Sequence, residues 1–117
     1  MKATNKQKGQ LGEEIAVKFL RDKGYDILKR NYRANRAEID IIAKNNGYII
    51  FVEVKYRECT THGYPSESVT SAKCAKIRCG AQYYILSEYG RDVDTRFDVI
   101  EIMNQDVLVI NHLEGAF

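Results

Sequence analysis

Apolar and polar residues follow two different periods along the chain, and these periods divide it into helices and strands. Between Gly9 and Gly24 apolar residues recur every three or four positions, which predicts an amphipathic helix. Its expected buried stripe is Leu11, Ile15, Ala16, Phe19 and Leu20. A second helix is predicted from an N-cap at Thr70 to about Glu88. Its expected buried face is Val69, Ala72, Ala75, Cys79, Tyr83 and Leu86.

The remaining segments are rich in β-branched and aromatic residues, which is typical of strands. The predicted strands are Tyr25–Arg33, two arms within Arg36–Arg57, Arg96–Met103 and Val107–Leu113. The order α-β-β-β-α-β-β predicts one α/β domain over residues 1–117, with helices flanking a mixed sheet. If the third and fourth strands are parallel, the crossover through the second helix is expected to be right-handed.

The segment Arg36–Arg57 is predicted to be a β-hairpin. Asn46-Gly47 lies between its two apolar arms and is the strongest short hairpin signal in the chain. With these two residues as the loop, Asn45 pairs with Tyr48, and the register of both arms follows.

This register brings acidic residues together on the hairpin. It places Asp40 opposite Glu53 and Glu38 opposite Lys55, and all four side chains are expected on one face. Like charges directly opposite each other destabilise a ladder, unless a cation lies between them. Mg²⁺ prefers oxygen ligands and is commonly held by one or two carboxylates. The pattern therefore indicates a metal site; the alternative is a solvated sheet face with a cross-strand Glu38–Lys55 ion pair.

Two acidic residues in the first predicted helix have different positions. Glu14 falls on the polar side, where it can pair with Lys18. Glu13 falls at the edge of the apolar stripe and is the better placed acid to reach a site between helix and sheet. The alternative for Glu13 is a role near the helix N-terminus, where the macrodipole favours negative charge.

Composition narrows the classes of protein further. The chain has 44% hydrophobic and 29% charged residues, which predicts a folded domain rather than a disordered one. It has no apolar run of about 20 residues and no apolar segment of a signal peptide near its start, so we expect a cytoplasmic protein with no membrane partner. The basic residues 1–8 are expected to be flexible. The three cysteines, Cys59, Cys74 and Cys79, show no C-x-x-C spacing and no zinc pattern with His62 or His112, so free thiols are expected.

Basic residues surround the acidic centre, although the net charge is only +2. Such a distribution suits a phosphodiester substrate, while scattered solubilising charge is the alternative. The candidates for contacting nucleic acid are Arg33, Arg36, Arg57 and Lys73. Lys73 lies in the first turn of the second predicted helix, where a bound phosphate would also be stabilised. The long loop Glu58–Ser68 precedes that helix and is a further candidate for a functional segment.

These residues also resemble a known pattern. Asp40 followed by Glu53-Val-Lys55 is similar to the D…(D/E)-x-K signature of restriction-endonuclease-like nucleases. A longer series resembles the YraN-like family of predicted bacterial endonucleases, from about Gly9 to Ile102. Its motifs here are Gly9-x-x-Gly12-Glu13-x-x-Ala16, Arg30-Asn31-Tyr32-Arg33, Glu38-Ile-Asp40, Phe51-Val-Glu-Val-Lys-x-Arg57, Ala72-Lys73 and Arg96-Phe-Asp98. One departure is Ala37, where the family pattern has glycine.

The resemblance implies a restriction-endonuclease-like fold, similar to Holliday junction resolvases and tRNA-endonuclease-like domains. It implies Asp40 and Glu53 as Mg²⁺ ligands, with Mn²⁺ as a substitute, and Lys55 as the catalytic lysine. It also implies that Glu13 reaches the metal; we add the carbonyl of Val54 as a third protein ligand.

The expected function is metal-dependent hydrolysis of nucleic acid, with DNA favoured over RNA and branched DNA as one candidate. A junction-resolving activity would need two sites, and hence a two-fold homodimer. The first alternative is a nucleic-acid-binding module of the same fold without catalysis. A second is a small scaffold, which would bind neither metal nor nucleic acid.

Overall fold

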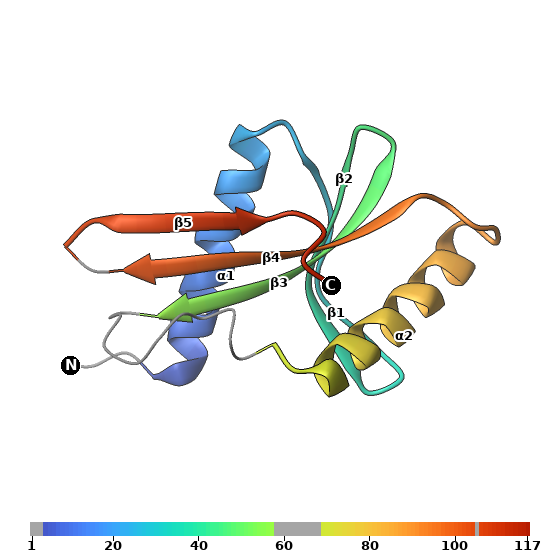
Figure 1. The fold of residues 1–117 in the computed structure, drawn as a ribbon, viewed down its shortest axis with the longest axis horizontal. Helices are drawn as coiled ribbons and strands as arrows, with labels where there is room; N and C mark the ends of the chain where they lie inside the picture. The colour runs from blue at the N-terminus through green and yellow to red at the C-terminus, as the bar shows by residue number, and fades with distance from the viewer. Residues whose placement is uncertain (1–3, 58–68, 105) are drawn as a thin grey trace.

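The computed structural model describes residues 4–57, 69–104 and 106–117 and shows a five-stranded sheet with a helix on each face. The elements are α1 (Asn5–Asp22), β1 (Asp26–Ala34), β2 (Ala37–Asn45), β3 (Tyr48–Arg57), α2 (Ser71–Glu88), β4 (Thr95–Asn104) and β5 (Leu108–Leu113). Figure 1 shows α1 crossing behind the sheet. The predicted α/β class and element order are confirmed. The predicted loop from Glu58 to Ser68, with Cys59 and His62, lies outside the described residues.

The sheet has the strand order β1-β2-β3-β4-β5 and is mixed. Only β3 and β4 pair in parallel, and α2 connects them; the other neighbours are antiparallel. One core cluster packs α1 against the sheet through Ala16, Val17 and Leu20, and a second packs α2 against the opposite face. Neither helix is long and apolar enough to cross a membrane.

Helix α1 begins four residues earlier than predicted. Thr4 caps it, because its hydroxyl accepts a hydrogen bond from the backbone N–H of Gln7 while the Gln7 side chain bonds the backbone of Thr4. Residues 5–8, which lie in the segment expected to be flexible, form the first turn of this helix. The far end agrees with the prediction, with Gly24 just beyond the C-cap Lys23.

Helix α2 has the predicted bounds but buries a different face. Its buried residues are Ile77, Gly80, Ala81 and Tyr84, whereas the predicted Cys79, Tyr83 and Leu86 are exposed, as are Ala72 and Ala75. The apolar residues of this helix lie on most of its sides, so their spacing alone does not single out one buried stripe. Packing against the rings of Tyr32 and Phe51 decides the face. Cys74 and Cys79 are free thiols, as predicted.

The turn of the central hairpin agrees with the sequence. Asn46 and Gly47 both have positive φ, at 51° and 82°, which is the geometry of a type I′ turn. The predicted register holds from Asn45↔Tyr48 to Ile41↔Val52.

A glycine in α1 allows the helix to lie close to β3. A Cβ added at Gly12 would lie 2.8 Å from the Cβ of Tyr56, whereas a Cβ at Gly9 would meet nothing within 4 Å. We expect Gly12→Ala to lower the free energy of unfolding by about 1–3 kcal/mol, because the overlap outweighs the better helix propensity of alanine. Gly9→Ala, the control in the same helix, should raise it by up to about 1 kcal/mol. Urea unfolding of both variants measures the difference, and a stabilised Gly12→Ala would contradict this close contact.

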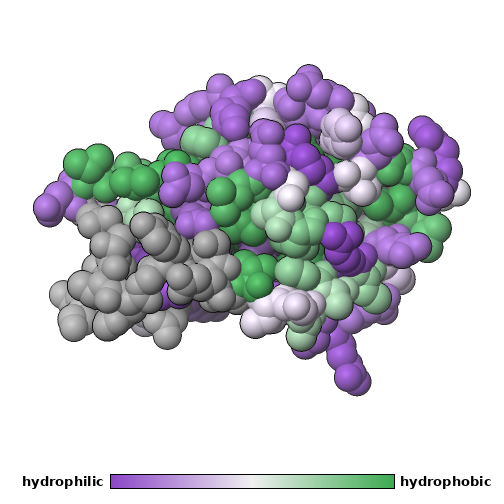
Figure 2. All heavy atoms as spheres, viewed as in Figure 1, coloured by the Kyte–Doolittle hydropathy of each residue, from purple (hydrophilic) through white to green (hydrophobic). Residues whose placement is uncertain are grey.

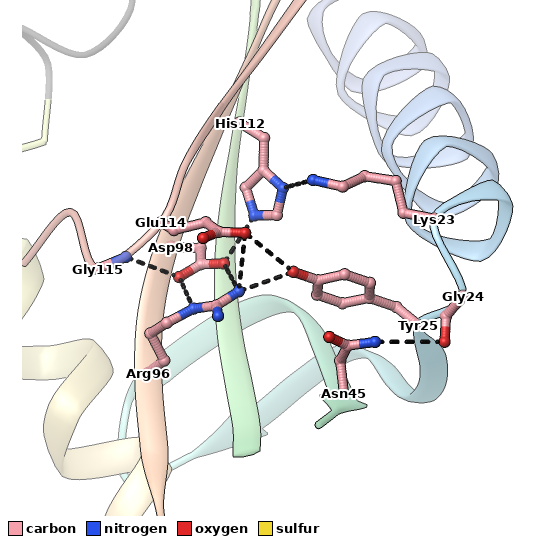
Figure 3. Close-up of polar contacts among 9 residues, drawn as sticks. All are labelled: Lys23, Gly24, Tyr25, Asn45, Arg96, Asp98, His112, Glu114 and Gly115. Atoms are coloured by element: carbon pink, nitrogen blue, oxygen red, sulfur yellow. Dashed lines mark hydrogen bonds and ion pairs between the residues drawn. The ribbon is translucent and has the colours of Figure 1, made fainter. Parts of the chain in front are cut away.

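A polar network around the buried Asp98 joins strands β4 and β5 to the C-terminal end of α1 (Figure 3). Asp98 on β4 is fully buried and accepts two hydrogen bonds from Arg96, at 2.9 and 2.8 Å. It also accepts one from the Gly115 backbone N–H at 3.0 Å and lies 2.7 Å from Nε2 of His112. Because Lys23 Nζ can only donate to Nδ1 of His112, the hydrogen of this imidazole lies on Nε2 and is donated to Asp98.

The tip of the β4–β5 hairpin exposes apolar side chains. Val107 is 71% exposed, and Leu108 and Val109 are also exposed. Figure 2 shows green, hydrophobic spheres gathered over this tip at the left of the molecule.

Candidate active site

The candidate site lies where β2 and β3 separate. Their ladder ends at Ile41↔Val52, so the predicted direct pairing of Asp40 with Glu53 is not formed. Instead, the Asp40 carboxylate accepts a hydrogen bond of 2.8 Å from the backbone N–H of Val54. The side chain of Asp40 thus replaces a backbone partner and lies in the gap between the two strands.

The side chains of β2 do not alternate strictly near this point. Ile39 and Ile42 both pack in the α2-side core, although they are three residues apart, while Ile41 packs in the α1-side core. The prediction that Glu38, Asp40, Glu53 and Lys55 share one face is therefore wrong. The break in alternation lets Asp40 turn toward β3.

One cavity of about 390 Å³ nevertheless collects the predicted acidic residues and lysines. It lies between the first turns of the two helices and the separated strands. Its lining residues are Lys8, Gly9, Glu13, Asp40, Glu53, Val54, Lys55, Tyr56 and Lys73. All four predicted catalytic residues and all three predicted metal ligands thus border the same space.

The surroundings of Asp40 destabilise the charged form of its carboxyl group. Burial, followed by the negative charges of Glu53 and Glu13, raises its pKa to about 7. The hydrogen bond from Val54 and the charge of Lys73 act in the opposite direction but are outweighed. A divalent cation between these carboxylates would remove the repulsion.

Two lysines contact the buried Glu53. Lys73 Nζ lies 2.7 Å from Glu53 Oε1, and Lys55 Nζ lies 3.6 Å from the same oxygen. Burial, together with the neighbouring Lys73, lowers the pKa of Lys55. Burial also acts to lower the pKa of Lys73, but the hydrogen bond and charge of Glu53 outweigh it and raise that pKa.

The remaining acids are arranged differently from the predictions. Glu38 Oε1 lies 3.7 Å from an Arg33 guanidinium nitrogen. This ion pair forms in place of the predicted Glu38–Lys55 pair, because β2 and β3 have separated before this point. Glu14 pairs with Arg30 on β1 rather than with Lys18, because α1 packs directly over that strand. Glu13 reaches the cavity, and burial raises its pKa despite a hydrogen bond with Asn31.

The donor set suits Mg²⁺ with two carboxylates. Within the described ranges, no three acidic, histidine or cysteine side chains are close enough to form a ready-made metal cluster. Asp40 keeps one carboxylate oxygen beyond its bond to Val54, and Glu53 borders the same cavity. Since the N–H and carbonyl of one residue lie on the same edge of a strand and the Val54 N–H bonds to Asp40, we expect the Val54 carbonyl on that edge too. These oxygens fit a magnesium ion that keeps several waters.

Basic residues continue from this cavity into neighbouring hollows. One hollow of about 340 Å³ is lined by Arg36, Lys73 and Lys76, and another by Lys6 and Arg33. Arg36 has a φ of 66° at the tip of the β1–β2 hairpin, a conformation unusual for a bulky residue. Arg57 lies further along β3, paired with Met103 of β4. Of the four predicted nucleic-acid contacts, Arg33, Arg36 and Lys73 thus lie along the hollows.

Sequence reasoning missed some residues of the site. Lys8 and Gly9 line the main cavity because α1 extends to Asn5. The spacing Thr4-x-x-Gln7 is a capping-box pattern and was a usable signal for this earlier helix start.

Comparison with known proteins identifies the family. The model of the uncharacterised protein family UPF0102 matches residues 12–102. A UPF0102 protein of Clostridioides difficile is 49% identical over 113 residues, which cover 97% of this chain and 98% of that protein. A UPF0102 protein of Persephonella marina is 44% identical over 110 residues, covering 94% of this chain and 92% of the relative. The chain therefore belongs to family UPF0102, the YraN-like family that its motifs resemble.

Proposed function

We propose that this protein is a Mg²⁺-dependent nuclease that hydrolyses phosphodiester bonds in nucleic acid, with DNA favoured over RNA. One observation carries the proposal: Asp40, Glu53 and Lys55 border a single cavity at the separation of β2 and β3. A purely structural role does not explain why a chain would gather repelling carboxylates there. The resemblance to restriction-endonuclease-like nucleases supports the same reading.

The protein's own groups have distinct roles in this proposal. Asp40, Glu53 and the Val54 carbonyl would hold the metal. When bound, Mg²⁺ supplies Lewis-acid chemistry, because it polarises the phosphoryl oxygen and makes a water more acidic. Lys55 would orient the attacking water, accept its proton or stabilise charge on phosphorus, and its lowered pKa favours proton exchange. Glu13 would bind water at the same cavity.

The flanking basic residues would position the substrate. Arg33, Arg36 and Lys76 line hollows on either side of Glu38, and phosphate contacts of this kind fix the register of a nucleic acid without reading its sequence. Such a surface equally suits a nucleic-acid-binding module without catalysis. The two functions differ in metal binding, since only the nuclease needs Asp40 and Glu53 to bind Mg²⁺ or Mn²⁺.

We expect Lys55→Ala to reduce cleavage by about 100- to 10,000-fold without any loss of metal affinity, because Lys55 acts on the water or phosphate rather than as a ligand. Lys44→Ala, which removes an exposed lysine from the same hairpin, is the control and should cleave like the wild type. The assay uses branched, single-stranded and duplex DNA and RNA, each with Mg²⁺ and with Mn²⁺.

A wild-type protein that cleaves none of these substrates with either metal would contradict the nuclease proposal. Titration calorimetry with Mn²⁺ then separates the remaining functions. Metal binding that depends on Asp40 would then show a metal site without nuclease activity, whereas salt-dependent nucleic-acid binding without metal would favour the binding module.

A further inference from the structure

Lys73 forms a closer ion pair with Glu53 than Lys55 does. Its ammonium lies 2.7 Å from Glu53 Oε1, compared with 3.6 Å for Lys55. The Glu53 side chain is only 5% exposed, whereas that of Lys73 is 41% exposed and that of Lys55 is 17% exposed. Lys73 therefore neutralises a buried carboxylate from a position that still reaches solvent.

The helix that carries Lys73 does not favour its charge. Lys73 lies in the first turn of α2, where its backbone N–H donates to the Thr70 hydroxyl at 3.1 Å. A cation in the first turn is unfavourable next to the positive end of the helix dipole, and this turn contains no acidic residue. The stabilising partner of the ammonium is therefore Glu53, on another element.

Lys73 also borders a second space. It lines the neighbouring hollow together with Thr70, Arg36 and Lys76, in addition to the main cavity. A lysine has a flexible four-carbon stem, so its ammonium can exchange between adjacent positions. In the second hollow it would join two other cations. Glu38 also lines this hollow, but its carboxylate is paired with Arg33, so the positive charges there suit a phosphate group.

We propose that Lys73 is a displaceable counter-ion of the metal site. In the metal-free protein it neutralises Glu53; a divalent cation displaces it, and the ammonium then contacts a substrate phosphate in the hollow beside Arg36 and Lys76. This inference rests on the proposed function and extends it to the order of binding. Metal and nucleic acid would bind cooperatively, because each favours the position of Lys73 that the other requires.

The test is Mn²⁺ titration by calorimetry at pH 8, without nucleic acid. We expect Lys73→Met to raise Mn²⁺ affinity about 10-fold, because the competing cation is gone. Lys73→Arg keeps the charge and should remain close to the wild type. Lys44→Met, the control at an exposed lysine of the β2–β3 hairpin, should leave Mn²⁺ affinity unchanged.

Two further measurements complete the test. Thermal unfolding shows that each variant is folded, and Mn²⁺ should raise the melting temperature of Lys73→Met more than that of the wild type. In a Lys55→Ala background, Mn²⁺ should tighten binding of a DNA duplex about 10-fold, and adding Lys73→Met should remove most of this gain.

Unchanged or weaker Mn²⁺ affinity in Lys73→Met would overturn the counter-ion role. If the wild type binds Mn²⁺ through Asp40 while Lys73→Met does not differ from it, only this inference fails. If the wild type binds neither Mn²⁺ nor Mg²⁺, the proposed nuclease function fails and this inference fails with it.

Discussion

Replacing Asp40 with asparagine is expected to abolish metal-dependent cleavage and also to stabilise the metal-free protein. Asparagine still accepts the hydrogen bond from Val54 but removes the charge that would hold the metal. Loss of the Lewis-acid contribution should lower cleavage by about 1,000-fold or more. The stability gain is the more diagnostic result, because a carboxylate with a purely structural role would show the opposite change.

The sign of the stability change follows from the raised pKa of Asp40. Its folded-state value of about 7 lies above the ordinary 3.8, so the protonated form is favoured by folding. This contribution is complete below about pH 4 and is lost as the pH rises to about 7. Asp40→Asn does not titrate. Above pH 7 it should therefore exceed the wild type by about 2 kcal/mol, a value reduced from the full shift because the site borders solvent.

The measurement is denaturant unfolding of both proteins at pH 5 and pH 8, in the presence of a chelator. Asp26→Asn makes the same change at an exposed acid on β1 and should alter neither cleavage nor stability. Cleavage by Asp40→Asn at a wild-type rate would contradict its role as a ligand. A loss of stability at pH 8 would contradict the charge repulsion in the cavity.

The second large effect is an expected loss of stability on replacing Asp98, which lies on β4 and does not line the cavity. Asp98→Asn keeps the shape of the side chain but leaves the Arg96 guanidinium with only the half-exposed Glu114 carboxylate, at 3.6 Å, and turns an amide N–H₂ toward other donors. Breaking a buried ion pair in this way should cost about 3 kcal/mol. For a chain of this size, the melting temperature should fall by about 10 °C or more.

The network also predicts acid sensitivity. Hydrogen bonds from His112, Arg96 and Gly115 outweigh burial and lower the pKa of Asp98 to about 2. A lowered carboxyl pKa contributes stability above the ordinary value of 3.8, and this stability is lost as the pH falls toward 2. About 2 kcal/mol should therefore disappear over this window in the wild type, and less in Asp98→Asn.

Unfolding at pH 5, 3 and 2 measures this difference. Asp94→Asn, at an exposed acid just before β4, is the matched control and should follow the wild type at every pH. Equal stability of Asp98→Asn and the wild type at pH 5 would show that the network contributes little. The cleavage assay should be unaffected by Asp94→Asn.

Local chemistry was sufficient to predict the central hairpin. Asn-Gly adopts positive φ with little strain, and the alternating arms set the register on both sides of the turn. The prediction failed only near Asp40, because a side chain there takes the place of a backbone partner. No pattern of hydrophobic residues reports such an exchange.

The face of α2 shows a different limit of sequence reasoning. Its apolar residues cover most of the helix surface, so several stripes have similar spacing. The side chains of the sheet that contact α2 therefore decide which stripe is buried. Ile77, Ala81 and Tyr84 are buried in the core between α2 and the sheet. There the ring of Tyr84 contacts the rings of Phe51 and Tyr32 edge-on. Contact between residues distant in the chain supplies this information.

The sequence by itself determined the element order, the hairpin turn, and the acids and lysines that carry the candidate chemistry. These features depend on residue type and on near neighbours in the chain, which local patterns report. Only the tertiary structure decided that β2 and β3 separate at Asp40, that Lys73 reaches Glu53 across two elements, and that Asp98 is buried with Arg96 and His112. These outcomes depend on packing and desolvation between residues far apart in the chain, and no local pattern encodes either quantity.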